Sequence, residues 1–246
     1  FSQFANVCLY DLRGHGKSSG VRAYVNDFFS FSRDLMEIVS YLKEEFKMSD
    51  YVLYAHSMGA LINCDFMQNH KLIRPDFISK KSNFYPAMVF LSAPPVQPAG
   101  WVGGLVKRIP QYWLNVLASF NKSAKIAGIL DIFYLSHDVR VFEDYLKDPL
   151  NSTKLHSKLL LQIVKRARIV FSRPLGLECP IHVVVGTKDR LVSHKDAMDY
   201  FQRFEPSAHV HVVDEGYHEL HNEVERIRVK YTNILQETII KLIKSS

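Results

Sequence analysis

Short apolar runs alternate along the chain with longer stretches in which apolar residues recur every three or four positions. The short runs are rich in β-branched residues, which favours strands; they occupy residues 6–10, 51–55, 87–92, 181–186 and 209–213. The runs at 87–92 and 181–186 are apolar at nearly every position, which is typical of strands covered on both faces. The pattern therefore predicts an α/β fold with a mostly parallel sheet and helices on both faces.

The longer stretches predict amphipathic helices. Apolar residues recur at helical spacing over 31–46, between the first two strands, and over 224–239 near the C-terminus. Residues 96–172 break the alternation, because they hold no convincing strand and carry aromatic patches and a basic helical stretch at 154–168. We interpret this interval as an inserted helical lobe, with ordinary connecting helices as the alternative. The chain then divides into a first core part (1–95), a helical cap (96–175) and a second core part (176–246).

Composition limits the classes of function. The 246 residues are 47% hydrophobic and 23% charged, as in ordinary globular domains, and no apolar run approaches the roughly 18 to 20 residues that span a bilayer. The net charge of +6 is moderate, which permits contact with anionic membrane surfaces and argues against nucleic acid as a partner. Cys8, Cys64 and Cys179 show neither a disulfide framework nor a metal-ligand spacing. We favour a cytoplasmic or peripheral-membrane location.

Residues 10–20, Tyr-Asp-Leu-Arg-Gly-His-Gly-Lys-Ser-Ser-Gly, superficially combine three active-site motifs. A P-loop would need a glycine at the position of Asp11, whose carboxylate repels phosphate. A dinucleotide fingerprint fails because no helix opens directly after the glycines. A hydrolase nucleophile fails as well, because Ser18 lies well past its strand and the helical pattern starts only at about Asn26. We therefore expect a glycine-rich turn.

A better candidate nucleophile is Ser57. The predicted strand 51–55 leads directly into Ala55-His-Ser-Met-Gly59, and apolar helical positions follow at once. Such a strand, sharp turn and helix expose the serine Oγ, and small residues two places on either side let strand and helix approach. Ala55 replaces the usual first glycine, a departure that narrows the turn by one methyl group.

A serine hydroxyl needs a base near neutral pH, and imidazole suits that role. Asp189 lies just past the strand at 181–186, and His218 lies just past the next strand. The order Ser57, Asp189, His218 is that of α/β-hydrolases. His218-Glu-Leu-His221 is one residue shorter than the zinc motif H-E-x-x-H, so we expect neither a metal nor a cofactor.

Several segments match the motifs of a known family. Residues 11–20 match a D-x-R-G-H-G-x-S-x-G turn, and residues 55–59 match a G-H-S-M-G elbow apart from the alanine. Residues 186–192 and 216–223 match its aspartate and histidine segments, and Leu135-Ser-His-Asp matches a signature of its cap. Through these motifs the chain resembles the monoacylglycerol lipase and lysophospholipase group of α/β-hydrolases, which shares a profile with the so-called serine aminopeptidases.

The resemblance implies an α/β-hydrolase in which Ser57 is the nucleophile, His218 the general base and acid, and Asp189 the group that orients the imidazole. The backbone N–H of Met58 would be one oxyanion donor, and the second would come from a loop upstream of residue 1. The implied substrate is a small monoacyl lipid ester, either a lysophospholipid or a monoacylglycerol, with peripheral membrane contact through the cap. The oligomeric state stays open.

The five strands expected here correspond to the last five of the family's sheet. In that sheet, a central strand lies between the strands that correspond to residues 6–10 and 51–55, and this strand would be absent here. Each unsatisfied buried backbone group on the open edges would cost about 1–3 kcal/mol. We therefore expect the N-terminal strands of the fold to be missing and the sequence to be part of a longer protein.

Two other functions stay open. An aminopeptidase-type serine peptidase would use the same triad but would need acidic groups near the site to hold a substrate amine. A non-catalytic binding module on the same fold would not need all three of Ser57, Asp189 and His218. In the cap, apolar residues either line an acyl tunnel, rest on lipid or pack the cap onto the core: Trp101, Leu105, Trp113 and Leu117.

Overall fold

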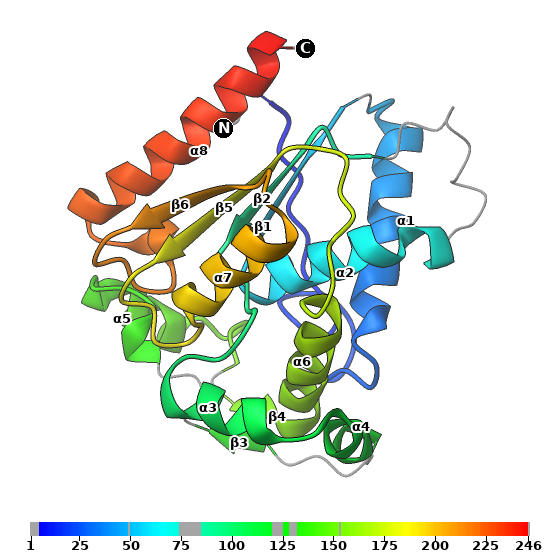
Figure 1. Ribbon diagram of the computed structural model, residues 1–246, viewed down its shortest axis with the longest axis vertical. Helices are drawn as coiled ribbons and strands as arrows, with labels where there is room; N and C mark the ends of the chain where they lie inside the picture. Colours follow the sequence, from blue (N-terminus) through cyan, green and yellow to red (C-terminus); the bar gives the residue numbers. More distant parts are fainter. Residues whose placement is uncertain are drawn as a thin grey trace.

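The computed structural model describes residues 5–48, 50–73, 85–119, 125–127, 132–152 and 154–245. Its central layer is a four-stranded sheet of order β1-β2-β5-β6 in which all neighbours are parallel (Figure 1). The strands are β1 (Val52–His56), β2 (Met88–Ser92), β5 (Ile181–Gly186) and β6 (His209–Val213). Four of the five strands expected from the sequence are thus confirmed, together with the parallel α/β class.

The prediction of a fifth strand at residues 6–10 is wrong. These residues carry no strand assignment and are exposed to solvent, with Leu9 88% exposed. A strand is defined by the ladder of hydrogen bonds to its neighbour, which an apolar pattern does not supply by itself. The only ladder of β1 within the described sheet runs to β2, so residues 6–10 have no partner there.

Helices cover both faces of the sheet, as expected. On one face pack α1 (Phe29–Glu45), α2 (Met58–Ile73) and α7 (His194–Phe204), and on the other packs α8 (Glu225–Ser245) (Figure 1). Alternation along β5 divides the core accordingly: Val183 and Val185 join the large cluster with α1, α2 and α7, whereas Val184 joins the cluster under α8. Both helices predicted from apolar periodicity, 31–46 and 224–239, are confirmed as α1 and α8.

The interval 96–172 is mainly helical but also contains a small sheet. Its helices are α3 (Gly100–Arg108), α4 (Gln111–Ser119), the short 3₁₀ helix η2 (Ile132–Tyr134), α5 (Val139–Lys147) and α6 (Ser157–Val170). Most of this interval gathers below the main sheet in Figure 1. The expectation of no strand is wrong, because β3 (Lys125–Ala127) pairs antiparallel with β4 (Lys154–His156). Three-residue strands are too short to leave a periodic pattern. Because β4 occupies Lys154–His156, α6 begins at Ser157 and not at residue 154 as expected.

A buried ion pair joins α6 to the helices of the core. Asp65 of α2 is fully buried and pairs with Arg166 of α6, whose Nε lies 2.6 Å from Asp65 Oδ1. Ser32 of α1 donates a hydrogen bond to the same carboxylate, and so does Asn69. These donors offset the cost of burying the charge. The domain limits at 95/96 and 175/176 stay a prediction.

The turn at residues 11–20 is confirmed. Its carboxylate Asp11 accepts a hydrogen bond from the backbone N–H of Lys17 at 2.8 Å, and Ser18 Oγ donates to the Asp11 carbonyl. Gly16 has a positive φ of 49°, and a Cβ there would lie 2.2 Å from the Asp11 side chain. Glycine is required at this position because the carboxylate occupies the space of a side chain.

Candidate active site

The turn between β1 and α2 consists of one residue, Ser57. The strand ends at His56 and the helix begins at Met58, so the chain reverses within Ser57, whose φ is 51°. A non-glycine residue in this left-handed region costs about 1–3 kcal/mol and is typical of functional sites. The Ser57 N–H donates to the Ser92 carbonyl of β2 at 2.9 Å, which secures the strained turn to the sheet.

The alanine in the elbow motif is compatible with this turn. A Cβ placed on Gly59 would lie 3.7 Å from Ala55 Cβ, an ordinary van der Waals contact. Strand and helix therefore approach closely at these two positions without a clash, and the extra methyl of Ala55 does not displace Ser57.

Asp189 is held by the loop that follows β5. Its Oδ1 accepts hydrogen bonds from the backbone N–H groups of Leu191 at 2.8 Å and Val192 at 3.0 Å. Its Oδ2 lies 2.7 Å from His218 Nδ1. Two amides on one oxygen fix the orientation of the carboxylate, so the other oxygen is presented to the imidazole.

His218 lies in the loop after β6 and completes the arrangement. Its Nε2 lies 2.8 Å from Ser57 Oγ, and its side chain is almost fully buried. The carboxylate of Asp189 fixes a proton on Nδ1, which leaves the Nε2 lone pair to accept the Ser57 hydroxyl proton. The three predicted side chains thus form one continuous chain of hydrogen bonds.

Close backbone packing brings the two loops together. A Cβ on Gly186, the last residue of β5, would lie 2.3 Å from the carbonyl oxygen of Gly216. Lys188 N–H also donates to that carbonyl at 3.0 Å. The glycine at the end of β5 therefore allows the Asp189 loop and the His218 loop to touch.

Two further histidines lie near His218, and the sequence pattern gave neither of them a role. The His56 ring centroid lies 4.8 Å from that of His218 and 5.0 Å from that of His221, and His56 Nδ1 lies 3.2 Å from Ser92 Oγ. Burial, reinforced by the two neighbouring imidazoles, holds the pKa of His56 well below its ordinary value, so His56 is uncharged at neutral pH. Alternation along β1 is the missed signal, because it places His56 on the same side as Tyr54, which reaches Tyr231 of α8.

Met58 is the first residue of α2, so its backbone N–H belongs to the helix terminus, where amides have no intrahelical acceptor. The positive end of the helix dipole lies at the same place. Met58 is therefore suited to stabilise an anion next to Ser57. Within the described residues, no three His, Cys, Asp or Glu side chains are grouped so as to hold a metal ion.

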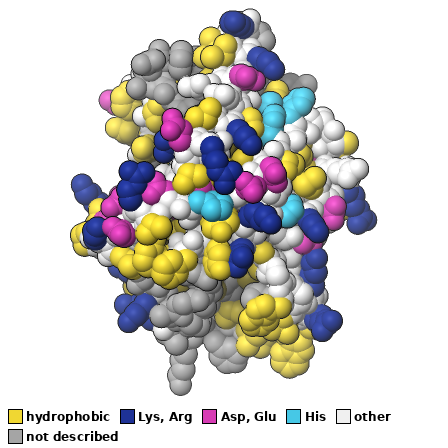
Figure 2. Space-filling model, turned by 90° about the vertical axis from the view of Figure 1, so that its left-hand side faces the viewer, with side chains coloured by type: hydrophobic (Ala, Val, Ile, Leu, Met, Phe, Trp, Pro, Cys, Tyr) yellow, Lys and Arg dark blue, Asp and Glu magenta, His cyan; other side chains and the backbone are white. Residues whose placement is uncertain are grey.

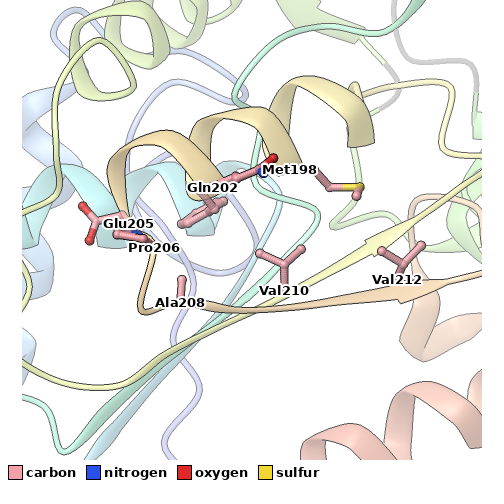
Figure 3. Close-up of a pocket in the computed structure, with 8 residues that line it drawn as sticks. Met198, Gln202, Glu205, Pro206, Ala208, Val210 and Val212 are labelled. Carbon is pink, nitrogen blue, oxygen red and sulfur yellow. The ribbon is translucent and has the colours of Figure 1, made fainter.

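Surface grooves lie elsewhere. One of about 320 Å³ runs between α7 and the edge strand β6, with Met198, Val210 and Val212 along it (Figure 3). Its carboxylate, Glu205, is buried and accepts a hydrogen bond from the Leu175 N–H at 2.5 Å. A second groove of about 590 Å³ lies beside the turn at residues 10–26. Neither of these two grooves is lined by Ser57, Asp189 or His218. The candidate site is therefore defined by the hydrogen bonds among these three residues.

The parallel sheet, the serine elbow and the strand-end loops are those of an α/β-hydrolase. Residues 3–225 match the family described as "Serine aminopeptidase, S33", and the chain belongs to that family. It is 24% identical over 229 residues to an uncharacterized abhydrolase domain-containing protein of Dictyostelium discoideum, covering 91% of this chain and 22% of that protein. The chain thus spans about a fifth of the length of this relative.

Monoacylglycerol lipases are among the similar proteins. The enzyme of Mycolicibacterium smegmatis is 26% identical over 222 residues, covering 89% of this chain and 73% of the relative. The crystal structure of Paleococcus ferrophilus monoacylglycerol lipase superposes with a TM-score of 0.72 at 19% identity, covering 95% of this chain and 81% of that one. The structural likeness confirms the fold. No helix in the described ranges is both long and apolar enough to cross a membrane.

Proposed function

We propose that this protein hydrolyses carboxylic esters of monoacyl lipids, either lysophospholipids or monoacylglycerols, through Ser57, His218 and Asp189. The observation that carries the proposal is the pair of hydrogen bonds at His218, 2.8 Å to Ser57 Oγ and 2.7 Å to Asp189 Oδ2. The strained backbone of Ser57 supports it, because strain of this kind persists where a side chain must be exposed for reaction.

In the proposed reaction, Ser57 Oγ attacks the ester carbonyl carbon while His218 Nε2 takes the hydroxyl proton. Asp189 stabilises the imidazolium through Nδ1, and the Met58 N–H donates to the oxyanion of the tetrahedral intermediate. His218 then returns the proton to the leaving alcohol oxygen as the C–O bond breaks, which gives an acyl-enzyme. A water molecule then attacks the acyl carbon while His218 takes its proton; His218 passes this proton to Ser57 Oγ as the acyl–oxygen bond breaks, which releases the fatty acid and restores the hydroxyl.

The substrate class is supported by the relatives named as monoacylglycerol lipases and by the apolar surface of α3 and α4. Trp101 is 80% exposed, Tyr112 69% and Trp113 55%, whereas Leu114 and Ala118 are the residues of α4 that pack inward. Figure 2 shows apolar side chains gathered towards the lower end of the molecule, the level of α3 and α4 in Figure 1. Exposed aromatic side chains of this kind suit peripheral contact with a lipid surface, which is part of the proposal.

A substrate panel tests the proposed chemistry. The parent protein is incubated with 1-monooleoylglycerol, oleoyl lysophosphatidylcholine and leucine p-nitroanilide, and free oleate and p-nitroaniline are measured. We expect oleate from at least one ester, no p-nitroaniline, and no product from Ser57→Ala. Ser18→Ala is the matched control, because Ser18 lies in Gly16-Lys-Ser-Ser-Gly20, which spells G-x-S-x-G but forms a turn, and the substitution should leave turnover intact. Cleavage of the anilide would favour a peptidase, and a folded parent that cleaves neither class would refute the proposal.

A further inference from the structure

The loop that carries His218 is bonded to a segment next to η2. Glu219 N–H donates to the Leu135 carbonyl at 2.8 Å, and His218 N–H lies 3.5 Å from the Tyr134 carbonyl. From the opposite direction, Ser136 Oγ donates to the Asn222 carbonyl at 2.9 Å. We call residues 217–223 the histidine loop and residues 134–138 the cap segment. The position of His218 thus depends on main-chain contacts outside the sheet.

Glu223 lies at the centre of this contact. Its side chain is fully buried and accepts four hydrogen bonds. One comes from Tyr217 N–H of the histidine loop at 2.8 Å, and one from the N–H of Val224, the residue after the loop, at 3.1 Å. Two come from the cap segment, from His137 N–H at 3.2 Å and His137 Nδ1 at 2.8 Å. Four N–H donors on one buried carboxylate offset its desolvation and join two segments 86 residues apart in sequence.

Aromatic contacts reinforce the same junction. The His137 ring stacks on the Tyr217 ring with centroids 3.7 Å apart and an interplanar angle of 28°. Tyr217 immediately precedes His218, and Tyr134 lies against Tyr217 at 5.7 Å. The guanidinium of Arg190, next to Asp189, lies 4.0 Å above the Tyr134 ring. Each of these contacts joins the cap segment to a residue adjacent to His218 or Asp189: Tyr217 precedes His218, and Arg190 follows Asp189.

We propose that Glu223 and His137 are positioning residues for His218, and that through them the cap segment controls whether the imidazole meets Ser57. The consequence of this positioning for catalysis rests on the proposed function. Without the buried carboxylate the four N–H groups lose their acceptor, so the histidine loop relaxes towards solvent. A shift of about 1 Å at a reacting group costs on the order of 10²-fold in rate. We expect the loss in kcat, because both residues act through the position of His218.

Two substitutions and one rescue test the proposal. Glu223→Gln places an amide NH₂ where only donors face it, and His137→Leu removes the side-chain donor. His137→Asn keeps an N–H at the position of Nδ1 and should restore the bond to Glu223. Glu215→Gln is the matched control, because Glu215 is half-exposed and its ion pair among the described residues is with the exposed Arg226.

Amide hydrogen exchange of the histidine loop is measured together with kcat and KM on p-nitrophenyl butyrate. We expect Glu223→Gln and His137→Leu to speed exchange at Tyr217 and Glu219 at least tenfold and to lower kcat at least tenfold, with KM within about twofold of the parent. His137→Asn should recover most of both losses, and Glu215→Gln should match the parent.

The two proposals fail in different ways. Unchanged exchange in Glu223→Gln and His137→Leu would overturn the positioning role, whatever the activity of the parent. Faster exchange with unchanged kcat would overturn it as well, because the loop would then not position His218. An equal loss in His137→Asn and His137→Leu would show that the donor is irrelevant. A parent that hydrolyses no ester refutes the proposed function, and the exchange data then still decide whether Glu223 joins the two segments.

Discussion

Asp189→Asn is the substitution whose outcome the geometry constrains most tightly. Asp189 Oδ1 accepts two backbone N–H groups, from Leu191 and Val192, so an asparagine must place its carbonyl oxygen there. Its NH₂ group then faces His218 Nδ1 at the position of Oδ2, 2.7 Å away. Nδ1 is forced to accept instead of donate, and the imidazole proton moves to Nε2. In that tautomer His218 has no lone pair for the Ser57 hydroxyl proton.

The expected loss in kcat is about 10⁴-fold, the cost of the wrong tautomer in a serine triad, which corresponds to about 5 kcal/mol. The assay is turnover of p-nitrophenyl butyrate, with far-UV circular dichroism to show that the variant is folded. Asp214→Asn serves as the control, because the hydrogen bond described for the Asp214 carboxylate comes from the Thr187 hydroxyl. A folded Asp189→Asn variant with kcat within tenfold of the parent would refute the assignment of His218 as base.

Three further predictions concern stability. Arg166→Met leaves the fully buried Asp65 without its ion-pair partner and should lower the free energy of unfolding by about 3–5 kcal/mol, measured by urea titration; a loss under about 1 kcal/mol would contradict the pairing. Gly59→Ala adds a Cβ at 3.7 Å from Ala55 within a helix and should be neutral or raise stability by up to about 1 kcal/mol, whereas a clear loss would mean that the elbow is tighter than described. Burial, with two neighbouring histidines, lowers the pKa of His182 to about 4, so the unfolded chain binds more protons below about pH 6.5 and stability should fall as pH drops from there towards 4. His182→Gln should flatten this fall in the urea midpoint, and an identical pH profile would contradict it.

The elements that the sequence predicted correctly are those whose apolar pattern reflects burial. The strands at β2 and β5 are covered on both faces, so nearly every residue is apolar and the pattern is unambiguous. The segment at 6–10 has a similar composition but no partner in the described sheet, and pairing is a tertiary property that composition does not encode. The pairing of β3 with β4 was missed for the same reason.

The candidate site was also predictable only in part. Ser57, Asp189 and His218 were recognisable because each lies just past a strand, and the structure brings them within hydrogen-bonding distance. Their catalytic roles stay predictions. The contacts of Glu223 were not recognisable, because its partners on the cap segment lie far away in sequence and become neighbours only through packing. The packing of His56 against His218 is likewise a consequence of the sheet face that β1 presents.

The most direct measurement is intact-mass analysis after treatment with a fluorophosphonate, which reacts only with an activated serine. We expect one adduct on the parent protein, none on Ser57→Ala, and an adduct on Ser18→Ala as on the parent. An unlabelled parent that is demonstrably folded, or an adduct that persists in Ser57→Ala, would contradict the claim that His218 activates Ser57.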